Sequence, residues 1–315
     1  MNRVSAILVL GLLSFGTIIS SSAKPAFAHT FGGDESASFL EKIAGLKVEI
    51  NLIDKDASNS TLVKWHVDKI SEFWNANDTK EVAERNQRVA NDVTTGLNNL
   101  FAEVNKTSPD TETVNQTASA LQDTLGEVVS VRIDSAQLQN VTVNALAVRA
   151  VLDETLEDYG IAAGASDEDE SAMSGDSNNS TSAANSAAQT TTTGPITILN
   201  MAAYQTSQGL AASAIDMFGK LKTMSQQGNN NTTTTTTAAL GEIDKGLTDL
   251  QKSITDKAPV DDVTKIVDDT INPNLQTAYG LQVVPEFPIP MLLSVGAIAG
   301  VVAVTRYRRN SSSRL

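Results

Sequence analysis

Apolar residues recur at spacings of three and four along most of the 315-residue chain, which is the period of an α-helix. Each apolar seam is narrow and the other positions of the same helix are polar, a pattern typical of helical bundles and coiled coils. The seams are Phe39, Ile43, Leu46, Ile50 and Ile53; Val89, Val93, Leu97, Leu100 and Val104; Leu138, Val141, Ala145, Val148, Leu152 and Leu156; Leu210, Ala214, Met217, Leu221 and Met224; and Leu240, Ile243, Leu247, Leu250 and Ile254. No stretch shows a convincing strand alternation. The sequence therefore predicts an all-α protein, an antiparallel helical bundle whose seams close within one chain or between chains.

Several residue types indicate where these helices begin. The expected start positions are Asp34 or Ser36, Asp78, Asp110 after Pro109, and Pro259. The pair Asn272-Pro273 is expected to bend or end the last helix. Trp65, Phe73 and Trp74 lie on one face of a helix, and we interpret them as packing residues.

Two stretches interrupt the helical pattern. Residues 164–194 consist almost wholly of Ser, Asp, Glu, Asn, Ala, Thr and Gly, and residues 228–237 contain a run of threonines. The first has too little apolar surface to offset the entropy of ordering, so it predicts a disordered linker, and the second predicts a flexible loop. We expect residues 29–163 and 195–280 to share one bundle, because the second part offers too few helices for a core of its own.

The N-terminus has the three parts of a secretory signal peptide. Arg3 is followed by an apolar stretch over residues 4–19, and Ala26 and Ala28 form a small-x-small cleavage site. We expect the secretion machinery to export the chain and signal peptidase to remove residues 1–28, which would leave His29 as the mature N-terminus. An uncleaved anchor helix is the alternative, disfavoured by the shortness of the apolar run.

The C-terminal residues 281–315 hold a second apolar segment. Residues 289–304 are apolar or small, and Arg306, Arg308 and Arg309 follow them. Sixteen residues of helix cover roughly 24 Å at ~1.5 Å per residue, which is slightly short of a ~30 Å hydrocarbon layer. The basic cluster predicts that this end faces the cytoplasm, so the body of the protein lies outside.

The residues just before this segment are Pro285, Glu286, Phe287 and Pro288. Together with the apolar segment and the arginines, they resemble the PEF-type C-terminal sorting signals of archaeal surface proteins. The resemblance covers about 25 residues and implies recognition by an archaeosortase, removal of the tail and attachment of the body to a lipid. A permanent transmembrane helix is the alternative. The helical body also resembles exported proteins of ammonia-oxidising archaea, which implies no activity.

Charge and composition narrow the possible partners. All 37 acidic residues lie between positions 34 and 286, whereas six of the 23 basic residues lie in the terminal segments. A surface this acidic excludes nucleic-acid binding and favours solubility. The chain has no cysteine, so it has no disulfide, thiolate metal site or cysteine nucleophile.

Asn-x-Ser/Thr sequons are frequent in the body of the chain, as expected for an exported glycoprotein. They begin at Asn59, Asn77, Asn105, Asn115, Asn140, Asn178, Asn179, Asn230 and Asn231. Since the chain is rich in Asn, Ser and Thr, some arise by chance. The sites in the linker and the loop are the most accessible.

The chemistry available to this chain is limited. Its two histidines, His29 and His66, suggest a copper site in which the mature N-terminal amine and both imidazoles supply nitrogen ligands. The alternative is that cleavage happens to leave a histidine and that His66 lies on a partly exposed helix face. No catalytic motif is present, so we expect no enzyme. The sequence favours a membrane-tethered structural or interaction protein of the cell envelope, with a protein partner or self-association, over a copper-binding protein.

Overall fold

The computed structural model describes residues 33–165, 194–228 and 234–281. These residues are helical almost throughout and include no strand, which confirms the all-α fold. The expected signal peptide, the sorting segment and most of the expected linker lie outside the described residues.

Most of the helices follow one another with short connections, but residues 164–200 separate α8 from α9. Their order is α2 (Gly33–Lys55), α3 (Ser60–Phe73), α4 (Ala76–Arg85), α5 (Gln87–Val104), α6 (Thr111–Arg132), α7 (Ser135–Leu138), α8 (Val141–Ala163), α9 (Met201–Gly228), α10 (Thr234–Thr255), α11 (Val260–Lys265), the π-helix η2 (Ile266–Ile271) and α12 (Asn272–Tyr279).

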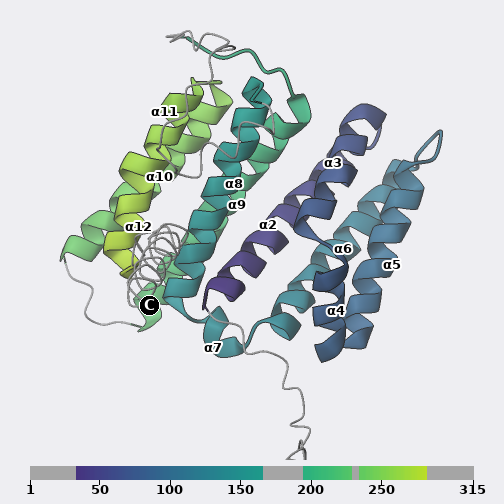
Figure 1. Ribbon diagram of the computed structural model, residues 1–315, viewed down its shortest axis with the longest axis horizontal. Helices are drawn as coiled ribbons and strands as arrows, with labels where there is room; N and C mark the ends of the chain where they lie inside the picture. Colours follow the sequence, from purple (N-terminus) through teal and green to yellow (C-terminus); the bar gives the residue numbers. More distant parts are fainter. Residues whose placement is uncertain (1–32, 166–193, 229–233, 282–315) are drawn as a thin grey trace, which may run out of the picture. The chain divides into compact units, whose positions relative to one another are not determined.

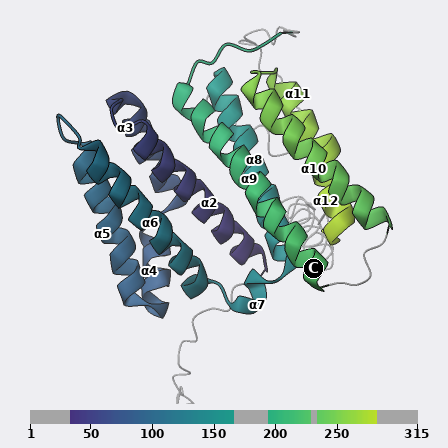
Figure 2. The same cartoon turned by 180° about the vertical axis from the view of Figure 1, so that it is seen from behind.

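Helix α2 lies between two groups of helices (Figures 1 and 2). It packs against α3 and α6 of the first group and against α8 and α9 of the second. Helices α4 and α5 complete the first group through α6, while α10, α11 and α12 pack onto α8 and α9. The helices that precede and follow the expected linker therefore contact each other directly, and the described residues from Gly33 to Gly280 belong to one compact unit.

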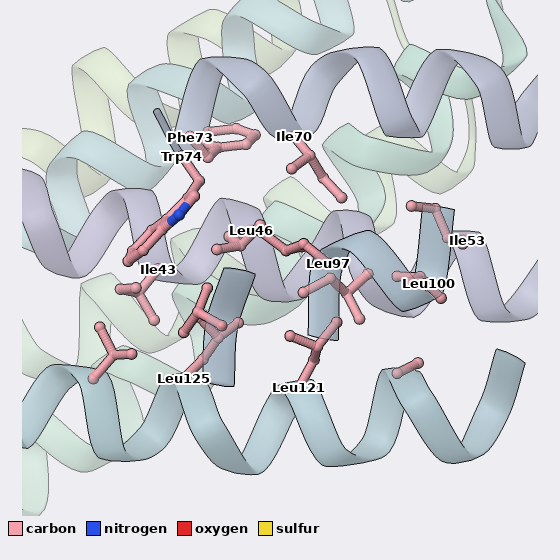
Figure 3. Close-up of a cluster of buried hydrophobic side chains, with 14 of the residues drawn as sticks. Ile43, Leu46, Ile53, Ile70, Phe73, Trp74, Leu97, Leu100, Leu121 and Leu125 are labelled. Atoms are coloured by element: carbon pink, nitrogen blue, oxygen red, sulfur yellow. The ribbon is translucent and has the colours of Figure 1, made fainter. Parts of the chain in front are cut away.

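The first group of helices encloses an apolar core (Figure 3). All five residues of the seam on α2 and all five of the seam on α5 are buried there, as the periodicity predicts. Phe73 and Trp74 join this core, which confirms the packing role expected of them, whereas Trp65 is only half-buried. Burial of these side chains supplies the main driving force for assembling α2 to α6.

Helix α8 is buried over a wider face than its seam predicts. Ala145, Val148 and Leu152 are buried, but Leu138, Val141 and Leu156 are only half-buried. The remaining buried apolar positions of the helix are Val143, Ala147, Val151, Tyr159 and Ala162. Helix α8 contacts α2, α9, α11 and α12, so one narrow stripe cannot describe it.

The helix starts follow capping chemistry with two corrections. Helix α2 already includes Gly33, so the expected start at Asp34 or Ser36 lies inside the helix. Asp110 caps α6 through its side chain, as expected. Helix α4, however, begins earlier than the expected start after Asp78, because Asn75 is its N-cap. Asp78 is the third residue of that helix and accepts a hydrogen bond from the Asn75 backbone N–H, which completes a capping box.

Pro273 does not end the last helical segment. Helix α11 runs through η2 into α12, and the Asn272 N–H donates to the carbonyl of Val267, five residues back. Proline has no N–H for the ordinary α-helical bond, and the wider π-turn just before it changes the hydrogen-bond register where that bond would be missing.

The threonine run was expected to be a loop up to residue 237, but α10 already begins at Thr234.

Among the described helices, none has the length and apolarity needed to cross a membrane. The segment 289–304, to which the membrane prediction applies, lies outside them.

Gly45 allows α2 and α3 to approach closely, since a methyl group at this position would come within 2.4 Å of the Phe73 ring. We expect Gly45→Ala to lower the free energy of unfolding by about 1–3 kcal/mol through overpacking. Gly126→Ala on α6 is the matched control, because a methyl group there meets nothing within 4 Å and should stabilise the helix by about 0.5–1 kcal/mol. Urea unfolding of both variants checks this, and equal effects would contradict it.

Candidate functional site

A layer of polar side chains lies where α2 and α3 meet α8 and α9. We call it the polar layer, and its members are Glu49 of α2, His66 and Lys69 of α3, Glu154 and Asp158 of α8, and Gln205 and Thr206 of α9. Glu49, His66, Asp158 and Thr206 are completely buried, and Lys69 is 4% exposed. Ionisable side chains are seldom buried to this degree unless they are paired, so this layer is the most unusual chemical feature of the described residues.

His66 bridges three helices. Its Nδ1 lies 2.7 Å from Glu49 Oε2 on α2, and its Nε2 lies 3.4 Å from Gln205 Oε1 on α9. The second Glu49 oxygen accepts a hydrogen bond of 2.8 Å from the Thr206 hydroxyl. Asp56 Oδ2 lies 3.8 Å from His66 Nε2. Both ring nitrogens therefore face protein oxygens, which orients the imidazole within the bundle.

The expectation that His66 occupies a partly exposed helix face is wrong, because its neighbours cover it completely. Burial also bears on the copper hypothesis. A copper ion could bind His66 Nδ1 only by displacing Glu49, and His29 lies outside the described residues. Within the part of the chain that the structure describes, no group of three or more His, Cys, Asp or Glu side chains is arranged to hold a metal ion.

Lys69 forms the second half of the polar layer. Its Nζ lies 2.6 Å from Glu72 Oε2, 3.1 Å from Glu154 Oε1 and 3.3 Å from Asp158 Oδ1. The ammonium group also lies 5.6 Å from the Phe73 ring centroid and 6.0 Å from the Trp65 ring centroid. One buried cation on α3 therefore holds two carboxyl groups of α8.

Burial has opposite consequences for the two partners of this pair. It raises the pKa of the Asp158 carboxyl to about 8, although the Lys69 cation opposes the shift. Burial alone would lower the pKa of Lys69, but the carboxylates of Asp158 and Glu154 outweigh it and raise that pKa above its ordinary value. Lys69 is therefore charged at neutral pH, and the Asp158 carboxyl takes up a proton more readily than an exposed carboxyl does.

The polar layer suits a structural role better than a catalytic one. Glu49, His66 and Asp158 lie where a substrate cannot reach them, since each is completely buried. The hydrogen bonds of Glu49 and His66 and the ion pair of Asp158 with Lys69 run between helices, which fixes how α2 and α3 align with α8 and α9. Directional interactions between buried polar groups restrict how helices can pack.

The sequence pattern missed most of the polar layer, although it contained a usable sign of it. Glu49 stands three residues after Leu46, within the apolar seam of α2. A polar residue in line with a buried stripe indicates a buried polar group. Its partners could not be found in this way, because they come from other helices, His66 from α3 and Thr206 from α9.

A shallow groove between α5 and α6 is the other concave feature of note. Its lining includes Asp92, Thr95, Gly96, Gln116, Thr117 and Thr124. Small uncharged polar residues dominate it, and it lacks a converging set of charged groups. It therefore points to no particular ligand chemistry.

Five of the expected glycosylation sequons lie in the described residues, and all five asparagines are exposed. Asn59 and Asn140 cap α3 and α8 through their side-chain oxygens. In contrast, the side-chain nitrogens of Asn105 and Asn115 donate to Phe101 O and Asp54 Oδ2. Asn77 lies in the first turn of α4. The sequons at Asn178, Asn179, Asn230 and Asn231 lie outside the described residues.

Comparisons of the chain with protein-family models, with curated proteins and with solved structures found no match. The function of this chain is therefore inferred from its own residues.

Replacing Lys69 should test the structural role of the polar layer. We expect Lys69→Met to lower the free energy of unfolding by about 3–5 kcal/mol, because the carboxyl groups around it lose their buried cation. Lys64→Met on the same helix removes an exposed lysine paired with Asp68 and should cost less than about 0.5 kcal/mol. Urea unfolding followed by circular dichroism measures both, and a small loss for Lys69→Met would refute the role.

Proposed function

We propose that this chain is an exported helical protein, tethered to the outer face of the cell membrane, with a non-catalytic structural or interaction role in the envelope. The observation that carries the proposal is the pair of terminal segments around the bundle. A signal-peptide pattern precedes it, and Pro285-Glu286-Phe287-Pro288, an apolar segment and an arginine cluster follow it.

The described residues support a non-catalytic role. Their histidine and the most perturbed carboxyl, Asp158, lie inside the bundle, where a hydrogen bond and an ion pair, respectively, join them to other helices. The exposed surface is rich in acidic side chains, which favours solubility outside the cell and disfavours contact with nucleic acid.

The tether follows from the length of the C-terminal apolar segment. Residues 289–304 are marginal as a membrane span. A sorting tag needs to hold the chain in the membrane only until it is processed, so we favour removal of the tail by an archaeosortase and attachment of a lipid close to Pro285. A lipid anchor would leave the body outside, as a transmembrane helix would.

Mass spectrometry of the mature protein from its native membrane tests the tether. We expect a C-terminus near Pro285, a lipid on it, and an N-terminus at His29. A mature chain that still includes residues 306–315 would refute removal of the tail. The transmembrane anchor would then remain as the explanation of the tether. A chain that retains residues 1–28 and is found in the cytoplasm would refute the proposed function altogether.

Glycopeptide analysis of the same sample tests the export route independently. Among the five described sequons, we expect the highest occupancy at Asn59 and Asn140. A glycan joins the side-chain nitrogen and leaves the oxygen free to cap the helix. Asn115 is the control, since its nitrogen is engaged with Asp54. Higher occupancy at Asn115 than at Asn59 would contradict this selection.

A further inference from the structure

The carboxyl groups of α8 are crowded against too little positive charge. Asp158 is completely buried, and neither of its oxygens accepts a well-formed hydrogen bond from another described residue. Its ion pair is with Lys69, which also faces Glu154 and Glu72 at shorter distances. One cation therefore stands against three carboxylates when all of them are ionised.

A second carboxyl, that of Glu41 on α2, is half-buried and is influenced by some of the same charges. The charges that act on it are those of Glu154 and Glu157 on α8, Lys69 on α3, and its neighbour Lys42. Lys42 Nζ lies 3.1 Å from Asp78 Oδ1, so the positive charge of Lys42 is shared between Asp78 and Glu41. Burial, reinforced by Glu154, raises the pKa of Glu41 to about 7.

The groups that face Asp158 come from each helix around the polar layer. Helix α3 contributes Lys69, α8 contributes Glu154, and α2 contributes Glu49, which is bonded to His66. Gln205 and Thr206, which α9 contributes to the layer, carry no charge. Every added carboxylate at this interface therefore increases the negative excess, and only protonation or separation of the helices relieves it.

We propose that the contact of α2 and α3 with α8 is proton-linked, with Glu41 and Asp158 as the groups that hold a proton when the interface is closed. Ionisation of Asp158 loosens this contact, because water then has to reach a completely buried charge. Ionisation of the half-buried Glu41 adds to the repulsion from Glu154. The bundle thus responds to the pH of its surroundings, wherever the protein is located.

The direction of the pH dependence follows from the raised pKa values. A carboxyl whose pKa is higher in the folded state contributes stability that is present below its unfolded pKa and lost as the pH rises through its folded pKa. The two values, about 7 for Glu41 and about 8 for Asp158, place the loss between about pH 4 and 8. Stability should therefore decrease as the pH rises through neutrality.

Urea unfolding of the full-length chain between pH 5 and 9 measures this linkage. The chain's two tryptophans report on unfolding by fluorescence, since Trp65 lies next to Lys69 of the polar layer and Trp74 lies in the apolar core. From pH 5 to pH 8 we expect the unfolding equilibrium constant to rise by about tenfold or more. Asp158→Asn and Glu41→Gln should each reduce that rise by about threefold or more, whereas the exposed Asp92→Asn should leave it unchanged. A rise equal to that of the unmodified chain in both Asp158→Asn and Glu41→Gln would overturn the proposal.

A distance measurement distinguishes loosening of the interface from a general loss of stability. The chain has no cysteine, so Ser71→Cys on α3 and Asp216→Cys on α9 accept two spin labels specifically. We expect the distribution of label distances to broaden between pH 6 and pH 9, and Asp158→Asn to suppress the broadening. An identical distance distribution at both pH values in the labelled chain with no further substitution would refute the proposal. This outcome can be read even if Asp158→Asn fails to fold.

Discussion

The arrangement of the described helices depends on the balance of charge around Lys69. Its buried ammonium group needs carboxylates next to it, but each further carboxylate adds repulsion among them. An ammonium group that is 4% exposed persists as a cation only next to carboxylates, and Glu154 of α8 supplies one at 3.1 Å, with the carboxyl group of Asp158 at 3.3 Å. Because Lys69 lies on α3 and its partners lie on α8, this requirement positions one group of helices against the other. The hydrogen bonds of Glu49 with His66 and Thr206 position α2 and α9 in the same way.

Apolar packing alone would leave this positioning less well defined. The core around α2 to α6 holds the first group together, but the facing surfaces of α2 and α8 also carry small residues such as Ala37 and Ala147, which allow several alignments. Directional hydrogen bonds between fully buried groups exclude the alternatives. Close approach at Gly209, where a methyl group would come within 2.5 Å of Val48, restricts the register of α9 on α2 as well.

Much of the fold could be predicted from the sequence, because a seam such as Ile43, Leu46 and Ile50 needs only the helical period to be recognised. Capping residues such as Asp110 were equally readable, since their chemistry is local. The start of α4 was misplaced because Asp78 serves as the third residue of a capping box and not as its first. The polar layer was missed for a different reason. The sequence around Lys69 and Asp158 does not distinguish them from exposed charged residues, because the helices that bury them come from other parts of the chain.

The terminal segments and the polar layer concern different aspects of the protein. The ends of the chain underlie the proposal of export and tethering, and the polar layer explains how a bundle without disulfides holds one arrangement. The central claim is that the attraction of Lys69 for the carboxyls of α8 joins the two groups of helices. A double-mutant cycle of Lys69→Met and Glu154→Gln, measured by urea unfolding, tests it most directly. We predict a coupling free energy of about 1–3 kcal/mol between the two sites, and a coupling near zero would contradict the account.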